Sequence, residues 1–113
     1  MSAITTHVLD TSRGRPAAGV PVVLKVRDSE AWRELGRGAT DADGRLRTLL
    51  PDGAPLDAGT YSLVFDTGAY FDLTGTSAFY PEVAVVFTLR EPGAHYHVPL
   101  LLSPFGYSTY RGS

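Results

Sequence analysis

The sequence predicts an all-β protein, a sandwich of two sheets with about eight strands and one short helix. Apolar residues alternate with polar ones over short runs, as they do in half-buried strands. Twelve glycines and eight prolines lie mostly between those runs, where turns are expected. The length of 113 residues fits one sandwich domain of about 100 residues. Residues 1–113 are therefore expected to form a single domain.

The first half of the chain contains four expected strands. The second has apolar side chains at every other position, which gives a strand one buried face; these are Val20, Val22, Leu24 and Val26. The turn at residues 41–44 ends in Gly44, which can adopt a left-handed conformation without steric cost. The expected strands cover residues 4–9, 20–27, 32–39 and 45–50.

The second half repeats this pattern after a loop that begins at Asp52-Gly53. The same two-residue spacing continues in two further apolar sets; these are Tyr61, Leu63 and Phe65, then Val83, Val85, Phe87 and Leu89. Residues 69–74 are expected to form a single helical turn between these two strands. The expected strands cover residues 61–66, 82–89, 95–103 and 107–111.

Composition excludes several classes of function. The net charge is -2 and no basic patch stands out, which argues against nucleic acid as a partner. The absence of cysteine rules out disulfides and thiol nucleophiles and leans toward a reducing compartment. Residues 1–10 do not follow the pattern of a signal peptide, and no apolar run is long enough for a membrane span. A cytoplasmic location is expected.

The two histidines of His95-Tyr96-His97 should share one face of their strand, together with Pro99 and Leu101. The opposite face is the apolar one and should point into the core. The histidine face is therefore outside the sandwich, yet it is unusually apolar for a wetted surface. We interpret this as a surface covered by another subunit, with chemistry at the interface. An exposed strand with two ordinary histidines is the alternative.

His7 and Arg45 are weaker candidates when each is read alone. A single strand histidine is more often structural than catalytic, and neither face of residues 4–9 is decisively apolar. Arg45 follows the Asp43-Gly44 turn, where a solvated arginine is common. Its planar guanidinium could equally hold a flat polar ligand or an anion. The C-terminal run of tyrosines and hydroxyls, which ends at Tyr110 and Ser113, indicates a tail that is held in place.

Taken together, these segments resemble the 5-hydroxyisourate hydrolase family over essentially the whole chain. The most specific are the terminal Tyr110-Arg111-Gly112-Ser113 and the stretch His95-Tyr96-His97-Val98-Pro99. The other matching segments are His7-Val8-Leu9-Asp10, Gly14-Arg15-Pro16-Ala17, Thr40-Asp41-Ala42-Asp43-Gly44-Arg45, Gly59-Thr60-Tyr61 and Phe79-Tyr80-Pro81-Glu82.

The resemblance implies a transthyretin-like sandwich that assembles as a homotetramer, a dimer of dimers, with active sites between the dimers. It implies hydrolysis of 5-hydroxyisourate to 2-oxo-4-hydroxy-4-carboxy-5-ureidoimidazoline in urate degradation, without a cofactor or metal. The implied residues are catalytic His7, Arg45, His97 and Ser113, with His7, Arg45 and Tyr110 binding substrate. Arg111 would hold the tail and His95 would support its strand.

Two other readings remain open at this point. His7, His95 and His97 could form a three-histidine zinc site, since strand histidines two apart can share a metal. The chain could also be a non-catalytic binding module, because its turn motifs recur in inert sandwich domains. The resemblance disfavours both, since it implies no metal and carries the histidines and the tail together.

Overall fold

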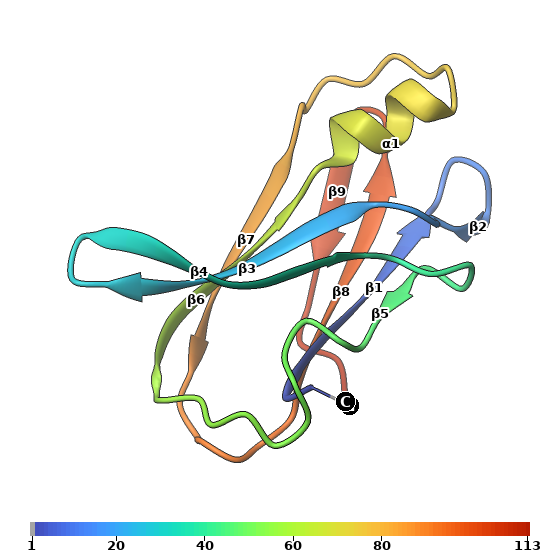
Figure 1. The fold of residues 1–113 in the computed structure, drawn as a ribbon. Helices are drawn as coiled ribbons and strands as arrows, with labels where there is room; N and C mark the ends of the chain where they lie inside the picture. The colour runs from blue at the N-terminus through green and yellow to red at the C-terminus, as the bar shows by residue number, and fades with distance from the viewer. Residues whose placement is uncertain (1) are drawn as a thin grey trace.

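The computed structural model describes residues 2–113 and has two sheets packed face to face, with one helix at one end (Figure 1). This confirms the predicted all-β sandwich. The elements in chain order are β1 Ile4–Asp10, β2 Arg15–Pro16, β3 Pro21–Asp28, β4 Ala31–Ala39, β5 Arg45–Leu46, β6 Gly59–Phe65, α1 Thr67–Leu73, β7 Val83–Leu89, β8 Tyr96–Ser103 and β9 Gly106–Thr109.

The first sheet has the order β2-β1-β8-β9, and β5 pairs with the same edge of β1 as β2 does. The pairing of β1 with β8 is parallel, whereas the other pairings in this sheet are antiparallel. The second sheet, β4-β3-β6-β7, is antiparallel throughout. The first and last strands of the chain therefore lie in the same sheet, as Figure 1 shows.

The core lies between the two sheets and consists of the alternating apolar positions that the sequence predicted. Val20, Val22 and Leu24 are fully buried, and so are Leu63 and Phe65. The predicted inner face of β8 is confirmed, since Tyr96, Val98, Leu100 and Leu102 are all buried. Because side chains alternate along a strand, the other set of residues on β1 and β8 points away from the core. We call this side of the first sheet the outer face; its residues are Thr5, His7 and Leu9 of β1 and His97, Pro99 and Leu101 of β8.

One predicted strand is much shorter than expected. The sequence indicated a strand over residues 45–50, but β5 consists only of Arg45–Leu46. After Arg47 the chain leaves the first sheet and crosses toward β4, where the Leu49 carbonyl packs against Gly36. Leu49 and Leu50 are buried, so their side chains fill the core from a loop. Burial without strand pairing explains why alternation alone overestimated this element.

The helix and the chain end differ from expectation by only a few residues. The expected helical turn at residues 69–74 is α1, and its first turn is capped by the Asp66 carboxylate, which accepts from the Ala69 N–H at 3.0 Å. The last strand ends at Thr109, two residues before the predicted end.

No helix in residues 2–113 is long and apolar enough to cross a membrane.

The crossing at Gly36 predicts a large stability effect. A Cβ added at Gly36 would collide with the Leu49 carbonyl oxygen, so Gly36→Ala should lower the free energy of unfolding by about 1–3 kcal/mol or more. Gly59→Ala is the matched control, because a Cβ there meets nothing within 4 Å. Urea denaturation at one chain concentration measures both, and equal midpoints for the two variants would contradict the observed crossing.

Candidate active site

The outer face of the first sheet brings three predicted residues together across three adjacent strands. His7 of β1 lies directly opposite Arg45 of β5 in the antiparallel register. Thr5, two residues before His7, lies beside His97 of β8 in the parallel register. Residues two apart on β1 share a face, so His7, Arg45 and His97 belong to one patch of side chains.

The turn before β5 holds Arg45 and His7 in position. The Asp41 carboxylate accepts hydrogen bonds from the N–H groups of Asp43 at 2.9 Å and Arg45 at 3.0 Å, and these bonds hold the pKa of Asp41 below its ordinary value. Gly44 has φ +76°, which confirms the predicted left-handed position. The Asp43 carbonyl then lies 2.9 Å from Nε2 of His7.

This contact determines where His7 carries a proton. A carbonyl oxygen can only accept a hydrogen bond, so Nε2 of His7 must be the donor. In a neutral imidazole the other nitrogen, Nδ1, then has the free lone pair. The backbone of the turn therefore selects one tautomer of His7.

His97 is half-buried and surrounded by positive charge. Its Nδ1 lies 2.8 Å from the Thr5 hydroxyl. Burial lowers the pKa of His97 below its ordinary value, and the charges of Arg45, His7, His95 and Arg47 lower it further, in that order. Both causes disfavour the charged imidazolium and favour the neutral ring.

A cavity of about 150 Å³ lies over this patch. Its lining residues are Thr5, Thr6, Arg45, Arg47, His95, His97 and Ser113. It collects three of the four predicted catalytic residues, and His7 adjoins it as the strand neighbour of Arg45. Two of its lining residues are arginines, which suit an anion or a carbonyl that develops negative charge.

The tail is fastened beside His97, as the sequence indicated. The Gly112 N–H donates to the His97 carbonyl at 2.8 Å, and the Arg111 guanidinium lies 4.4 Å from the centre of the Tyr96 ring. A Cβ at Gly112 would come within 2.6 Å of Cδ2 of His97. Glycine therefore lets the tail lie against the imidazole and bring Ser113 to the cavity.

Tyr110 is the predicted site residue that the structure does not bring to this cavity. It is 58% exposed and lines a separate cavity of about 280 Å³ beside β7, together with Tyr96 and Val98. Within one chain it therefore faces the open edge of the sandwich, whereas the other predicted residues face the outer side of the first sheet.

Four residues of the cavity lining were missed or given only a supporting role by the sequence reasoning. These are Thr5, Thr6, Arg47 and His95. Thr5, Arg47 and His95 each lie two residues from a predicted one, and the alternation of strand side chains could have found them. The Thr5 hydroxyl contacts both rings of the His95–His97 pair, at 3.1 Å and 2.8 Å.

The zinc alternative would require one nitrogen of each of the three histidines to face a common point. Nε2 of His95 and Nδ1 of His97 both bond to Thr5, while Nε2 of His7 bonds to the Asp43 carbonyl. Among residues 2–113 no group of three or more histidines and carboxylates is arranged to hold a metal ion.

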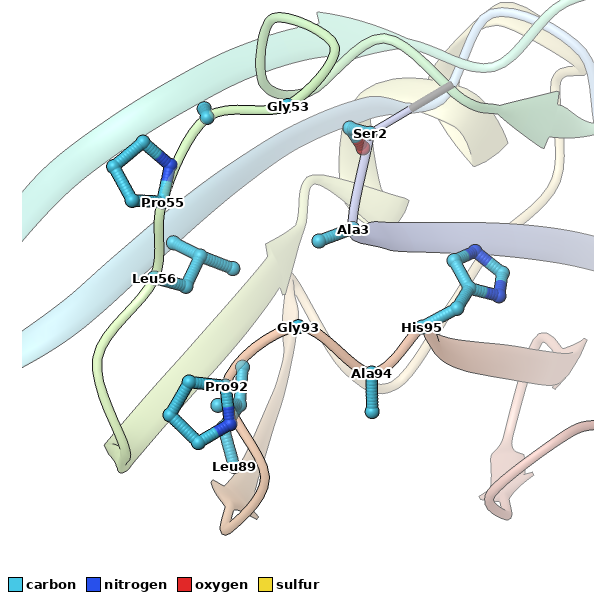
Figure 2. Close-up of a pocket in the computed structure, with 11 residues that line it drawn as sticks. Ser2, Ala3, Gly53, Pro55, Leu56, Leu89, Pro92, Gly93, Ala94 and His95 are labelled. Atoms are coloured by element: carbon cyan, nitrogen blue, oxygen red, sulfur yellow. The ribbon is translucent and has the colours of Figure 1, made fainter.

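A larger cavity of about 520 Å³ lies at the end of the sandwich (Figure 2). Its walls are mostly small or apolar residues such as Ala3, Leu56 and Pro92, and His95 stands at its rim. It contains no other histidine and no arginine or carboxylate. The smaller cavity therefore has the groups that can move protons and stabilise charge.

Known proteins that are similar to this chain match it over nearly its whole length. The family model described as the HIUase/Transthyretin family matches residues 4–112. A 5-hydroxyisourate hydrolase of Mesorhizobium japonicum is 50% identical over 114 residues, which cover 97% of this chain and 91% of that protein.

Two solved structures overlay closely on the fold. The structure of Klebsiella pneumoniae 5-hydroxyisourate hydrolase has a TM-score of 0.84 and 40% identity, and covers 97% of this chain and 98% of its own. Sea bream transthyretin in complex with thyroxine has a TM-score of 0.91 and 33% identity, and covers 98% of this chain and 95% of its own.

The charge environment of His97 predicts its titration. His97 should titrate below 6.5, the ordinary histidine value, in an NMR titration of the three histidines. Arg45→Met should raise the pKa of His97, because Arg45 is the largest charge contribution. Arg33→Met is the control, since Arg33 pairs with Asp28 at 3.5 Å on the other sheet. A His97 pKa that is unchanged by Arg45→Met would show that the charge of Arg45 does not act on His97.

Proposed function

The chain belongs to the HIUase/Transthyretin family, and from this premise we propose that it hydrolyses 5-hydroxyisourate to 2-oxo-4-hydroxy-4-carboxy-5-ureidoimidazoline in urate degradation. The observation that carries the proposal is the meeting of His7, Arg45 and His97 on one outer face. The fold alone does not select it, because a thyroxine-bound transthyretin overlays equally well. A neutral histidine beside arginines suits hydrolysis, which needs a base and an oxyanion donor.

In the mechanism we propose, His97 activates water. Its Nδ1 is engaged by Thr5, so Nε2 is the nitrogen that accepts the proton of the attacking water. The new C–O bond forms at a ring carbonyl, whose oxygen gains negative charge next to the Arg45 guanidinium. The C–N bond then breaks, and the leaving nitrogen takes the proton that His97 accepted from water, which returns His97 to its neutral form.

His7 has the second proton-transfer role in this proposal. Its Nε2 donates to the Asp43 carbonyl, so Nδ1 is the nitrogen that takes part in the transfer. Ser113 and Tyr110 hydrogen-bond the flat heterocycle. Ser113 lines the cavity of its own chain, whereas Tyr110 does not, so its contact has to come from a neighbouring copy.

We extend the proposal to a homotetramer, a dimer of dimers with active sites at the dimer–dimer interface. Small-molecule sites usually have volumes of about 300–1,000 Å³, and the cavity of one chain has about 150 Å³. Leu9 and Leu101 are only half-buried on the same outer face, which favours cover by a second copy.

A cytoplasmic location stays a prediction that rests on the absence of cysteine.

The decisive experiment is a direct rate measurement. Urate oxidase generates 5-hydroxyisourate in the cuvette, and its decay is followed with and without the protein. His7→Ala, Arg45→Ala and His97→Ala should each lose about 100-fold or more in rate, the lower range for acid–base groups, and should keep the wild-type circular dichroism spectrum. Arg33→Ala, at an exposed site on β4, is the control. Near wild-type turnover in all three variants would show that the site lies elsewhere.

The shared-site proposal predicts that assembly and activity fail together. Leu101→Glu places a charge on the outer face, two residues from Pro99, and should split the tetramer and reduce hydrolysis. Leu73→Glu, at an α1 residue that is 82% exposed, should change neither. Sedimentation velocity and the decay assay measure the two effects. A Leu101→Glu variant that no longer forms tetramers yet keeps full activity would show that the site does not need the dimer–dimer interface.

A further inference from the structure

The Thr5 hydroxyl occupies a position between two imidazole rings. Its Oγ1 lies 2.8 Å from Nδ1 of His97 and 3.1 Å from Nε2 of His95. The rings are nearly parallel, with an interplanar angle of 16° and centroids 6.5 Å apart. Thr5 is 2% exposed, so water does not readily replace either bond. The hydrolysis described above uses Thr5 only as the partner of Nδ1 of His97 and gives His95 no part.

We propose that Thr5 is a positioning residue that, backed by His95, holds His97 in the tautomer whose Nε2 lone pair faces the substrate cavity. This inference rests on the proposed hydrolysis for its functional meaning. Its structural content concerns only the proton positions among three side chains.

Hydrogen counting restricts the arrangements. A threonine hydroxyl has one hydrogen to donate and can accept two hydrogen bonds. It cannot donate to both rings, so at least one ring nitrogen must donate to Oγ1. If His97 donates from Nδ1, the hydroxyl is free to donate to Nε2 of His95. If His95 donates instead, the hydroxyl can donate to Nδ1 of His97, and Nε2 of His97 must then carry the proton.

The electrostatics of the cavity favour the first arrangement. Burial and the charges of Arg45, His7, His95 and Arg47 keep the pKa of His97 low, so its ring is neutral. Nε2 makes no hydrogen bond within residues 2–113, and the ring lines a cavity that also contains Arg45 and Arg47. Near two positively charged guanidinium groups a ring nitrogen with a lone pair is favoured over one that carries an N–H. The neutral ring therefore carries its proton on Nδ1.

The proton on Nδ1 matters at the step in which His97 takes a proton from water. The Nδ1–H already donates to Thr5, so the positive charge that appears on the ring strengthens an existing hydrogen bond. The hydroxyl passes this polarisation to His95, which is exposed to solvent. His95 thus has a role through Thr5 without touching the substrate.

The test compares variants that differ in one hydroxyl. Thr5→Val keeps the β-branched shape and removes the hydroxyl, so kcat should fall at least ~10-fold, a part of the ~100-fold that loss of an acid–base group costs, with KM nearly unchanged. Thr5→Ser keeps the hydroxyl and should retain most of kcat. Thr11→Val is the matched control, since Thr11 donates to the Leu102 carbonyl at 3.1 Å along the same strand pair and reaches no histidine.

A second measurement needs no substrate. Long-range ¹H–¹⁵N correlation NMR of wild-type protein, above the pKa of His97, should show the Nδ1–H tautomer of His97, and Thr5→Val should move it toward Nε2–H. An Nε2–H tautomer in the wild type, or wild-type kcat in Thr5→Val, would overturn the inference. A wild-type protein that leaves 5-hydroxyisourate untouched would overturn the proposed function instead, while the tautomer would still decide the role of Thr5.

Discussion

The parallel pairing of β1 with β8 is the constraint on which the site depends. It places Thr5 beside His97 by a ladder of backbone hydrogen bonds that runs from Ile4↔Tyr96 to Asp10↔Leu102. Side chains on a strand alternate with a period of two, so a slip of one residue would move the histidine into the core and an apolar residue out. Burial of Tyr96, Val98 and Leu100 opposes any such slip. The hydrophobic core therefore sets the distance between the proposed catalytic groups on the outer face.

The other parts of the site are attached to this pair of strands by backbone as well. The turn at residues 41–44 presents Arg45 opposite His7, and it is closed by the Asp41 carboxylate and the left-handed Gly44. On the far side, the Gly112 N–H bonds to the His97 carbonyl. Most of the site thus rests on sheet pairing and one tight turn, which limits side-chain motion and preserves the geometry that proton transfer needs.

Some features of this fold and site can be predicted from a single sequence, whereas others cannot. Strands with a regular two-residue alternation, such as β6 and β8, were predicted within two residues, and the outward position of His97 followed from the inner face of β8. Residues 45–50 were misjudged because Leu49 and Leu50 are buried from a loop. Thr5 was not recognised because its role depends on the register of β1 against β8, a pairing between residues about ninety positions apart that local periodicity cannot supply.

The arginines give the site a property that the fold by itself does not have. A transthyretin that binds thyroxine has the same sandwich, so hydrolysis has to depend on charge and proton positions at the outer face. Burial lowers the pKa of His97 most, and the charge of Arg45 adds to this effect, with a smaller contribution from Arg47; this favours the neutral ring that the proposed mechanism needs. In the proposed hydrolysis, the same positive charge stabilises the oxyanion that forms once water attacks. Since a lowered pKa also weakens a base, the developing negative charge must compensate, and this requires the arginines and His97 to face one cavity, as they do here.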